Sequence, residues 1–159
     1  MSDRIAVMSK GNVLQIGEPQ EIYERPASKY VADFIGETNF IDGVVKNQNG
    51  STVEVELHGT GTICVESSRM FTNGQPVSVA VRPEKFRMNT EVKGGNNLQG
   101  RVEDVIYIGT DTHYGVRFAG GQKVRLREQN IMHGHHEIIQ IGDEVSVSFA
   151  YSSPRLLTE

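Results

Sequence analysis

Three histidines stand close together near the C-terminal end of this chain of 159 residues, and imidazole nitrogen is a common zinc ligand. They are His133, His135 and His136, with the carboxylate of Glu137 beside them. Adjacent and alternate positions in a segment that contains Gly134 converge poorly on one ion, because zinc sites separate their ligands more clearly. We keep the three histidines as weak metal candidates and expect a solvated loop there.

A second group combines acidic and aromatic side chains around Gly109. Carboxylates pair with ammonium groups, and aromatic rings attract cations, so this group has the chemistry that a polyammonium ligand needs. The same residue types are also common on solvated surfaces. The ligand candidates are Asp104, Tyr107, Asp111 and Tyr114.

The tripeptide Arg82-Pro83-Glu84 follows an alternating apolar segment at Val77–Val81. Pro83 cannot donate a hydrogen bond to a strand ladder, so it ends the strand or lies on a sheet edge. Two interpretations remain for Arg82 and Glu84: a strand-ending turn, or charged groups that reach a partner surface. We keep all three residues as interface or structural candidates.

Composition excludes several classes of function. The net charge is −4, from 16 Lys and Arg against 20 Asp and Glu, so the chain as a whole does not attract the phosphates of nucleic acid, and we expect no nucleic-acid binding. No apolar run reaches the roughly 20 residues that span a bilayer, so we expect no direct membrane insertion. The local sequence suggests no Ser/His/Asp or Cys/His set, and we predict no catalytic residue.

Helical and turn signals occupy the first part of the chain. Two short apolar runs flank Ser9–Asn12 and predict a β-hairpin. A short helix should begin at Pro19 and stop before Pro26, because proline suits the first helical turn and not the interior. A second helix should have Ser28 as its N-cap and Gly36 as its C-cap. Its expected apolar face consists of Tyr30, Val31, Phe34 and Ile35.

From residue 38 onward the apolar residues alternate with a period of two, and glycine-containing turns recur at intervals of about ten residues. This pattern predicts a mainly β domain, a small barrel or sandwich. The expected strands are 43–46, 52–58, 77–82, 100–108, 113–118, 123–127 and 144–150.

A string of segments in fixed order resembles one known family, the ATP-binding subunits of bacterial ABC importers, where the ATPase domain gives way to an OB-like domain called TOBE. The residues that carry the resemblance are Ser2–Met8, Gln15–Gly17, Pro19, Glu21–Pro26, Phe34–Gly36, Asn39–Phe40, Val81–Glu84 and Gly142–Val145. The amino-acid sequences of Gly36–Phe40 and Val81–Lys85 are most similar to the putrescine and spermidine importer branch.

The resemblance implies a fold and a division of the chain. Residues 1–37 would be the end of the ATPase domain with its connector helices, a β-hairpin and two short helices. Residues 38–159 would be an OB-like (TOBE) β-barrel with a regulatory and dimerisation role. We also expect residues 1 to about 17 to be poorly packed, or paired with the edge of another copy.

The ATPase chemistry of the family needs a Gly-x-x-x-x-Gly-Lys-Ser/Thr loop, which holds the phosphates of ATP. Neither Gly-Lys-Ser nor Gly-Lys-Thr occurs in this sequence, so we expect a part of a longer subunit that binds no cofactor itself. ATP and Mg²⁺ would bind to the full-length parent. Ala119-Gly-Gly-Gln122 resembles the core of the ABC signature motif, but alternating residues flank it and predict a hairpin turn.

The resemblance therefore predicts the C-terminal region of a polyamine importer ATPase, in the cytoplasm at the inner membrane. Its partners would be a second copy, through the TOBE domain, and the membrane subunits, through the ATPase domain. The alternative is a free-standing OB-like module that binds an oxyanion or a polyamine. Such a module could use backbone amides at Lys93–Gly95 or Gly59–Thr62.

Overall fold

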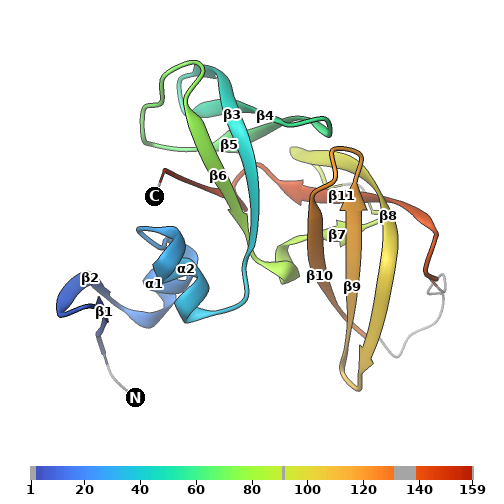
Figure 1. The fold of residues 1–159 in the computed structure, drawn as a ribbon, viewed down its shortest axis with the longest axis horizontal. Helices are drawn as coiled ribbons and strands as arrows, with labels where there is room; N and C mark the ends of the chain where they lie inside the picture. Colours follow the sequence, from blue (N-terminus) through green and yellow to red (C-terminus); the bar gives the residue numbers. More distant parts are fainter. Residues whose placement is uncertain (1–2, 91, 131–138, 159) are drawn as a thin grey trace.

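Two five-stranded antiparallel sheets form the body of the molecule, and a hairpin with two helices precedes them (Figure 1). The computed structural model describes residues 3–90, 92–130 and 139–158. Among these residues, no helix is both long enough and apolar enough to cross a membrane. The mainly β architecture predicted from the two-residue period is confirmed.

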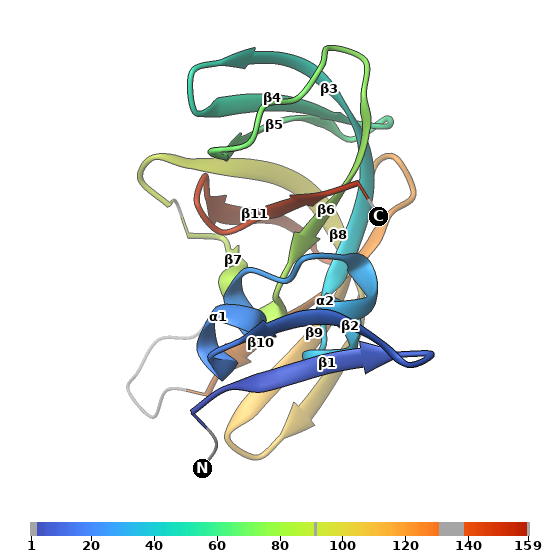
Figure 2. The ribbon, with the colours of Figure 1, turned by 90° about the vertical axis from the view of Figure 1, so that its left-hand side faces the viewer.

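The N-terminal hairpin pairs β1 (Ile5–Ser9) with β2 (Asn12–Gly17). Its inner face is covered, because Val7 is 2% exposed and packs with Ile22 and Val31 of the two helices. The expectation of poor packing was therefore wrong for the inner face of the hairpin, because the two helices cover it (Figure 2). The outer face is bare, and its cross-strand pair of Met8 and Val13 is about half exposed.

Helices α1 (Pro19–Glu24) and α2 (Lys29–Ile35) begin where the sequence predicts. The Ser28 hydroxyl accepts a hydrogen bond from the Val31 amide at 3.3 Å, which satisfies one free donor of the first turn of α2. Gly36 is the C-cap of α2, as predicted, in an extended conformation. One detail differs from expectation: the rings of Tyr30 and Phe34 stack on each other in solvent.

The first sheet has the order β12-β6-β3-β4-β5, and the second has the order β10-β9-β8-β11-β7. The strands are β3 (Asn39–Asn49), β4 (Thr52–Leu57), β5 (Gly61–Glu66), β6 (Pro76–Val81), β7 (Arg87–Met88), β8 (Gly95–Ile108), β9 (Asp111–Phe118), β10 (Lys123–Gln129), β11 (Glu144–Ala150) and β12 (Arg155–Leu157), with a 3₁₀ turn η1 (Pro83–Lys85) between β6 and β7. One apolar cluster joins both sheets, and its aromatic residues Phe86 and Phe149 meet edge to face at 5.3 Å.

Side-chain amides close the two seams between the sheets. At one seam, Asn39 donates to the carbonyl of Arg125 and accepts from its amide, both at 2.8 Å. At the other, Asn96 makes the same pair of bonds with the backbone of Cys64, again at 2.8 Å. Each asparagine thus replaces one residue of a strand ladder and satisfies backbone groups at a sheet edge.

Four β elements were missed by the sequence reasoning: β5, β7, β12 and the first part of β8. Each lacks clean alternation, since β5 contains Cys64 between two buried apolar residues and β12 has only three residues. The seven strands that were predicted are all present, with ends shifted by up to five residues.

Candidate functional site

The guanidinium of Arg82 lies at the joint between the helices and the barrel. Arg82 directly follows β6, is 7% exposed, and points its side chain back toward the helices. Its Nη1 donates to the carbonyls of Ala32, Gly36 and Glu37 at 3.0, 2.9 and 3.1 Å, and also to the Thr38 hydroxyl. Its Nη2 donates to the carbonyl of Tyr23 at 2.9 Å. One side chain therefore holds the ends of both helices.

The local backbone explains this arrangement. The last carbonyls of any helix lack partners within it, and a cationic side chain at a helix C-terminus satisfies them and complements the helix dipole. Pro83 ends β6 and starts η1, so the chain turns away and leaves Arg82 beside α2. Gly36 packs closely here: a Cβ there would lie 3.2 Å from the Tyr23 ring, which is tight, and 3.5 Å from Arg82 Nη1, which is ordinary contact.

Tyr23 and Glu84 extend the joint. The Arg82 guanidinium carbon lies 4.1 Å from the centre of the Tyr23 ring, a cation–π contact. The Tyr23 hydroxyl donates to Glu84 Oε2 at 2.5 Å, and Arg127 Nη2 lies 3.8 Å from the same oxygen. Glu84 thereby links α1 with η1 and, through Arg127, with β10.

Burial and hydrogen bonding shift the acid–base behaviour of these groups. Burial is the main reason that the pKa of Tyr23 is raised, with the hydrogen bond to Glu84 adding to it. Burial also lowers the pKa of Arg82, which its neighbours Tyr23 and Glu84 oppose. Burial alone would raise the pKa of Glu84, but the hydrogen bond from Tyr23 and the charges of Arg127 and Lys85 leave that pKa lowered. At neutral pH the joint holds Arg82 charged, Glu84 ionised and Tyr23 neutral.

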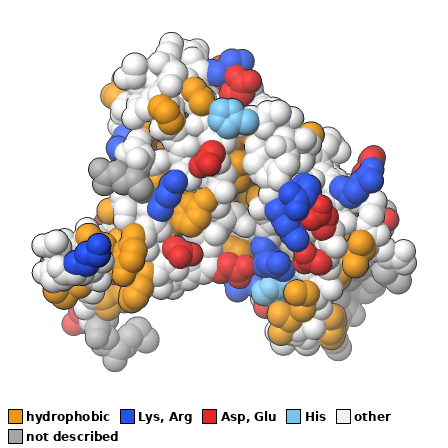
Figure 3. Space-filling view, in the orientation of Figure 1, with side chains coloured by type: hydrophobic (Ala, Val, Ile, Leu, Met, Phe, Trp, Pro, Cys, Tyr) orange, Lys and Arg blue, Asp and Glu red, His pale blue; other side chains and the backbone are white. Residues whose placement is uncertain are grey.

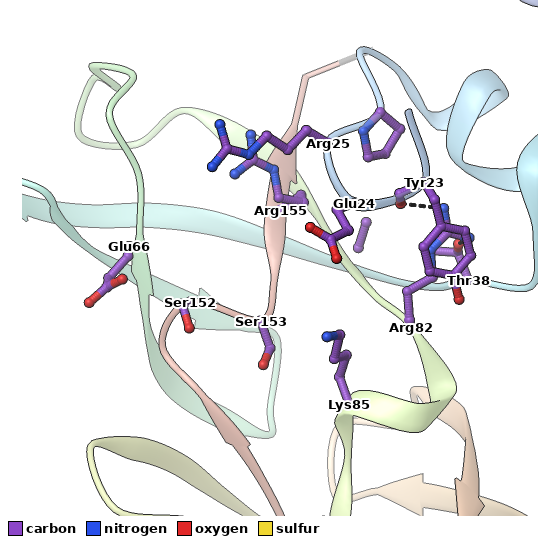
Figure 4. A pocket seen from close by; sticks show the side chains of 12 residues that line it. Tyr23, Glu24, Arg25, Thr38, Glu66, Arg82, Lys85, Ser152, Ser153 and Arg155 are labelled. Carbon is purple, nitrogen blue, oxygen red and sulfur yellow. Dashed lines mark hydrogen bonds between the residues drawn. The ribbon is translucent and has the colours of Figure 1, made fainter. Parts of the chain in front are cut away.

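A cleft of about 300 Å³ opens beside the joint (Figure 4). It lies between the segment that follows α1, the end of β6 with η1, and the start of β12. Cationic side chains predominate in its lining: Arg25, Arg82, Lys85 and Arg155, against Glu24 and Glu66.

The structure places Arg82, Pro83 and Glu84 together at this joint, inside the chain. Whether they also contact another subunit stays a prediction. The sequence reasoning missed Tyr23, Thr38 and Arg155, which join the same region from positions up to 132 residues apart in number. No local pattern links them, because only the fold brings α1, β6 and β12 together.

The four residues near Gly109 do not share one face. In the β8–β9 ladder Tyr107 pairs with Thr112 and Val105 with Tyr114, which places both tyrosines on the inner face of the sheet. Asp104 and Asp111 lie on the outer face, and Asp104 is bound by Lys123 at 2.7 Å and Arg125 at 3.4 Å. The acidic and aromatic groups therefore do not converge on one face, and polyamine binding here stays a prediction.

Other candidates behave differently. His133, His135 and His136 lie outside the described residues, and within those that are described no group of three metal-ligating side chains comes together. Ala119–Gln122 forms the predicted hairpin turn between β9 and β10. The turn near Gly59 uses its Thr60 hydroxyl within the chain, where it accepts from the Gly120 amide at 3.0 Å.

Comparison with known families and proteins agrees with this arrangement. Residues 79–157 match the TOBE domain family. The chain is 37% identical over 157 residues to a "Spermidine/putrescine import ATP-binding protein PotA" of Roseobacter denitrificans, covering 99% of this chain and 43% of the relative. It is 43% identical over 149 residues to the protein of the same name from Ruegeria pomeroyi, covering 94% and 39%. This chain thus spans about two fifths of the length of these relatives.

A solved structure of similar fold is the cytoplasmic molybdate-binding protein ModG with molybdate bound. The TM-score is 0.61, and the likeness covers 76% of this chain and 96% of that one. At 15% sequence identity it establishes the OB-like fold of the barrel and nothing about a ligand.

Proposed function

Because this chain belongs to the ATP-binding subunits of ABC importers and matches the C-terminal part of the spermidine/putrescine type, we propose that it is the regulatory and dimerisation region of such a subunit. The parent subunit would bind ATP and Mg²⁺, act at the cytoplasmic face of the inner membrane, and couple hydrolysis to polyamine import with the membrane subunits. The observation that carries the proposal is the match over 99% of the chain, which includes the helices as well as the barrel.

The proposed domain boundary lies between residues 37 and 38. Two separate apolar clusters support it: one within the hairpin and helices, and a larger one within the two sheets. A small third cluster of Ala32, Ala80 and Leu157 packs α2 against the first sheet, next to the Arg82 joint. The helices would therefore transmit the position of the ATPase domain to the barrel.

The bare outer face of the hairpin supports the assignment of residues 1–37 to the ATPase domain. Met8, Val13 and Ile16 are each more than half exposed, and Figure 3 shows apolar side chains gathered over this end of the molecule. Contiguous exposed apolar groups of this kind mark interaction surfaces in soluble proteins. The remainder of the parent ATPase domain would cover them.

The end of the β8–β9 hairpin is the surface we assign to the second copy. Ile106, Tyr107 and Ile108 are consecutive and 48%, 73% and 52% exposed, so both faces of the hairpin present apolar groups. Figure 3 shows apolar side chains at this end also. A two-fold dimer uses one self-complementary patch on each copy, which an apolar hairpin end can provide.

Equilibrium sedimentation tests self-association. We expect the weight-average mass to rise toward twice the chain mass with concentration, and Ile106→Asp with Ile108→Asp to abolish the rise. Met70→Asp is the matched control, because Met70 is 80% exposed but lies in a loop of the other sheet. A monomer at millimolar concentration would count against dimerisation through this domain.

A further inference from the structure

The cleft beside the Arg82 joint gathers positive charge from three parts of the chain. Arg25 follows α1, Lys85 belongs to η1, and Arg155 begins β12. In Figure 4 the guanidinium groups of Arg25 and Arg155 lie side by side at one end and Lys85 lies toward the other, with the Glu24 carboxylate between them and Ser152 and Ser153 along one side. The backbone thus brings cations and hydroxyl donors to one cavity.

These cations differ from most arginines of the second sheet in having no acidic partner. Four arginines of the second sheet form ion pairs: Arg101 with Glu144, Arg117 with Glu103, Arg125 with Asp104 and Glu37, and Arg127 with Glu84. Within the described part of the chain, no carboxylate oxygen lies within 4.0 Å of a side-chain nitrogen of Arg25, Lys85 or Arg155. Glu24 and Glu66 line the cleft without reaching them.

The charges at this end of the cleft repel one another. Burial lowers the pKa of Arg155 first, and the positive charges of Arg25 and Arg69 lower it further. Like charges that face each other are unfavourable unless an anion lies between them. In a chain of net charge −4, a local excess of cations is the signature of a site for a negative group.

Hydrogen bonds hold the backbone at both arginines in place without any anion. The Gln15 amide donates to the Arg25 carbonyl at 3.1 Å and accepts from the Ala27 amide at 2.8 Å, which holds the segment in place. Arg155 is paired with Ala80 in the β12–β6 ladder. A site whose backbone is held in this way loses less freedom when it binds.

We propose that this cleft binds a small oxyanion of the phosphate or phosphate-ester class, with Arg25 and Arg155 as its main ligands and Lys85, Ser152 and Ser153 as further donors. Guanidinium groups match phosphate oxygens with two parallel hydrogen bonds each, and a doubly charged anion offsets two cations. The volume of about 300 Å³ exceeds that of inorganic phosphate and leaves room for the organic part of an ester. Nothing in the assignment to an importer subunit requires this site.

Binding would also join the helices to the barrel a second time. Arg25 moves with α1, while Arg155 belongs to the first sheet, so one anion between them bridges the same two parts that Arg82 connects. An anion that binds only this docked arrangement stabilises it by mass action. The cleft is thereby a place where a phosphorylated metabolite can regulate how firmly the helices are held.

The test is calorimetric titration of the chain with inorganic phosphate and with pyrophosphate, at constant ionic strength set with sodium chloride. We expect saturable binding of both, weakened by about tenfold or more in Arg25→Gln and in Arg155→Gln, since each variant loses one charged pair. Arg101→Gln is the control, because Arg101 is exposed and pairs with Glu144 far from the cleft. It should bind as the wild type does.

Thermal unfolding separates binding from structure. Arg155→Gln removes repulsion, so its melting temperature without phosphate should equal or exceed that of the wild type, while the phosphate-induced rise should be smaller than in the wild type. No binding at 10 mM phosphate or pyrophosphate, or equal affinity in Arg155→Gln, would overturn the proposal. A destabilised Arg155→Gln variant that still binds phosphate would assign Arg155 a structural role and overturn it equally.

Discussion

Replacing Arg82 with lysine should release the two helices while the barrel stays folded. A lysine ammonium keeps the charge but has three donors on one nitrogen, whereas Arg82 reaches Tyr23 with one nitrogen and the end of α2 with the other. Lysine cannot satisfy both helix ends at once. It also loses the planar stacking on the Tyr23 ring, 4.1 Å away.

The contacts that Arg82 makes give the expected size of the effect. Losing one hydrogen bond from a charged donor costs about 1.5–3 kcal/mol, and losing a partly desolvated cation–π contact costs about 1 kcal/mol. We therefore expect roughly 3 kcal/mol less stability for helix docking. At 1.4 kcal/mol for each factor of ten, the open form of the helices should become on the order of 100-fold more populated.

Native-state hydrogen exchange, read by peptide mass spectrometry, measures this directly. Peptides that cover α1 and α2 should exchange about 100-fold faster in Arg82→Lys. Peptides from β8, β9 and β11 should be unchanged, because the main apolar cluster does not include Arg82. Arg101→Lys serves as the control for a surface arginine, since its pair with Glu144 is largely exposed.

Two results would refute the reasoning. Unchanged exchange in α1 and α2 would mean that the small cluster of Ala32, Ala80 and Leu157 holds the helices without Arg82. Equal acceleration in helices and barrel would mean that the two parts unfold as one unit, and that the joint is not local.

Three further predictions concern other parts of the structure. The pKa of Glu84 is lowered in the folded chain, so its ionised form adds to the free energy of unfolding above the unfolded pKa of about 4.3, and this stabilisation is lost as the pH falls below that value. In urea unfolding from pH 6 to pH 3, the free energy of unfolding should therefore fall less in Glu84→Gln than in the wild type. Gly120→Ala should destabilise the chain by more than about 2 kcal/mol in urea unfolding, because the new Cβ would lie 1.9 Å from the His58 carbonyl oxygen. Asn96→Ala leaves the backbone amide and carbonyl of Cys64 without their partner, and should cost about 1–3 kcal/mol by the same measurement.

The spacing of apolar residues, together with the residue types typical of turns and helix ends, was enough to predict much of this fold. The seven expected strands follow from two-residue alternation, and the starts of both helices follow from Pro19 and Ser28. These signals are local, so a single sequence contains them. The apolar face of α2 was predicted less well, since Tyr30 and Phe34 satisfy the spacing but stack on each other in solvent.

The joint itself could be predicted only in part. Pro83 correctly marked the end of a strand, but the sequence left Arg82 with either a turn or a partner surface to contact. Its actual acceptors are main-chain carbonyls, which every residue has, so no side-chain pattern identifies them in advance. The cleft has the same limitation, because Arg25 and Arg155 are 130 positions apart and meet only after folding.

The choice of acceptors at Arg82 has a consequence for how such a chain can change over time. Because four of its acceptors are carbonyl oxygens, the side chains of α2 can be exchanged freely on the solvent side without weakening the attachment. The positions restricted in type are Arg82, Tyr23 and Thr38, which contact one another, and Ala32, which is buried against the first sheet. A barrel of this kind could therefore be joined to a pair of helices from another protein with very few substitutions.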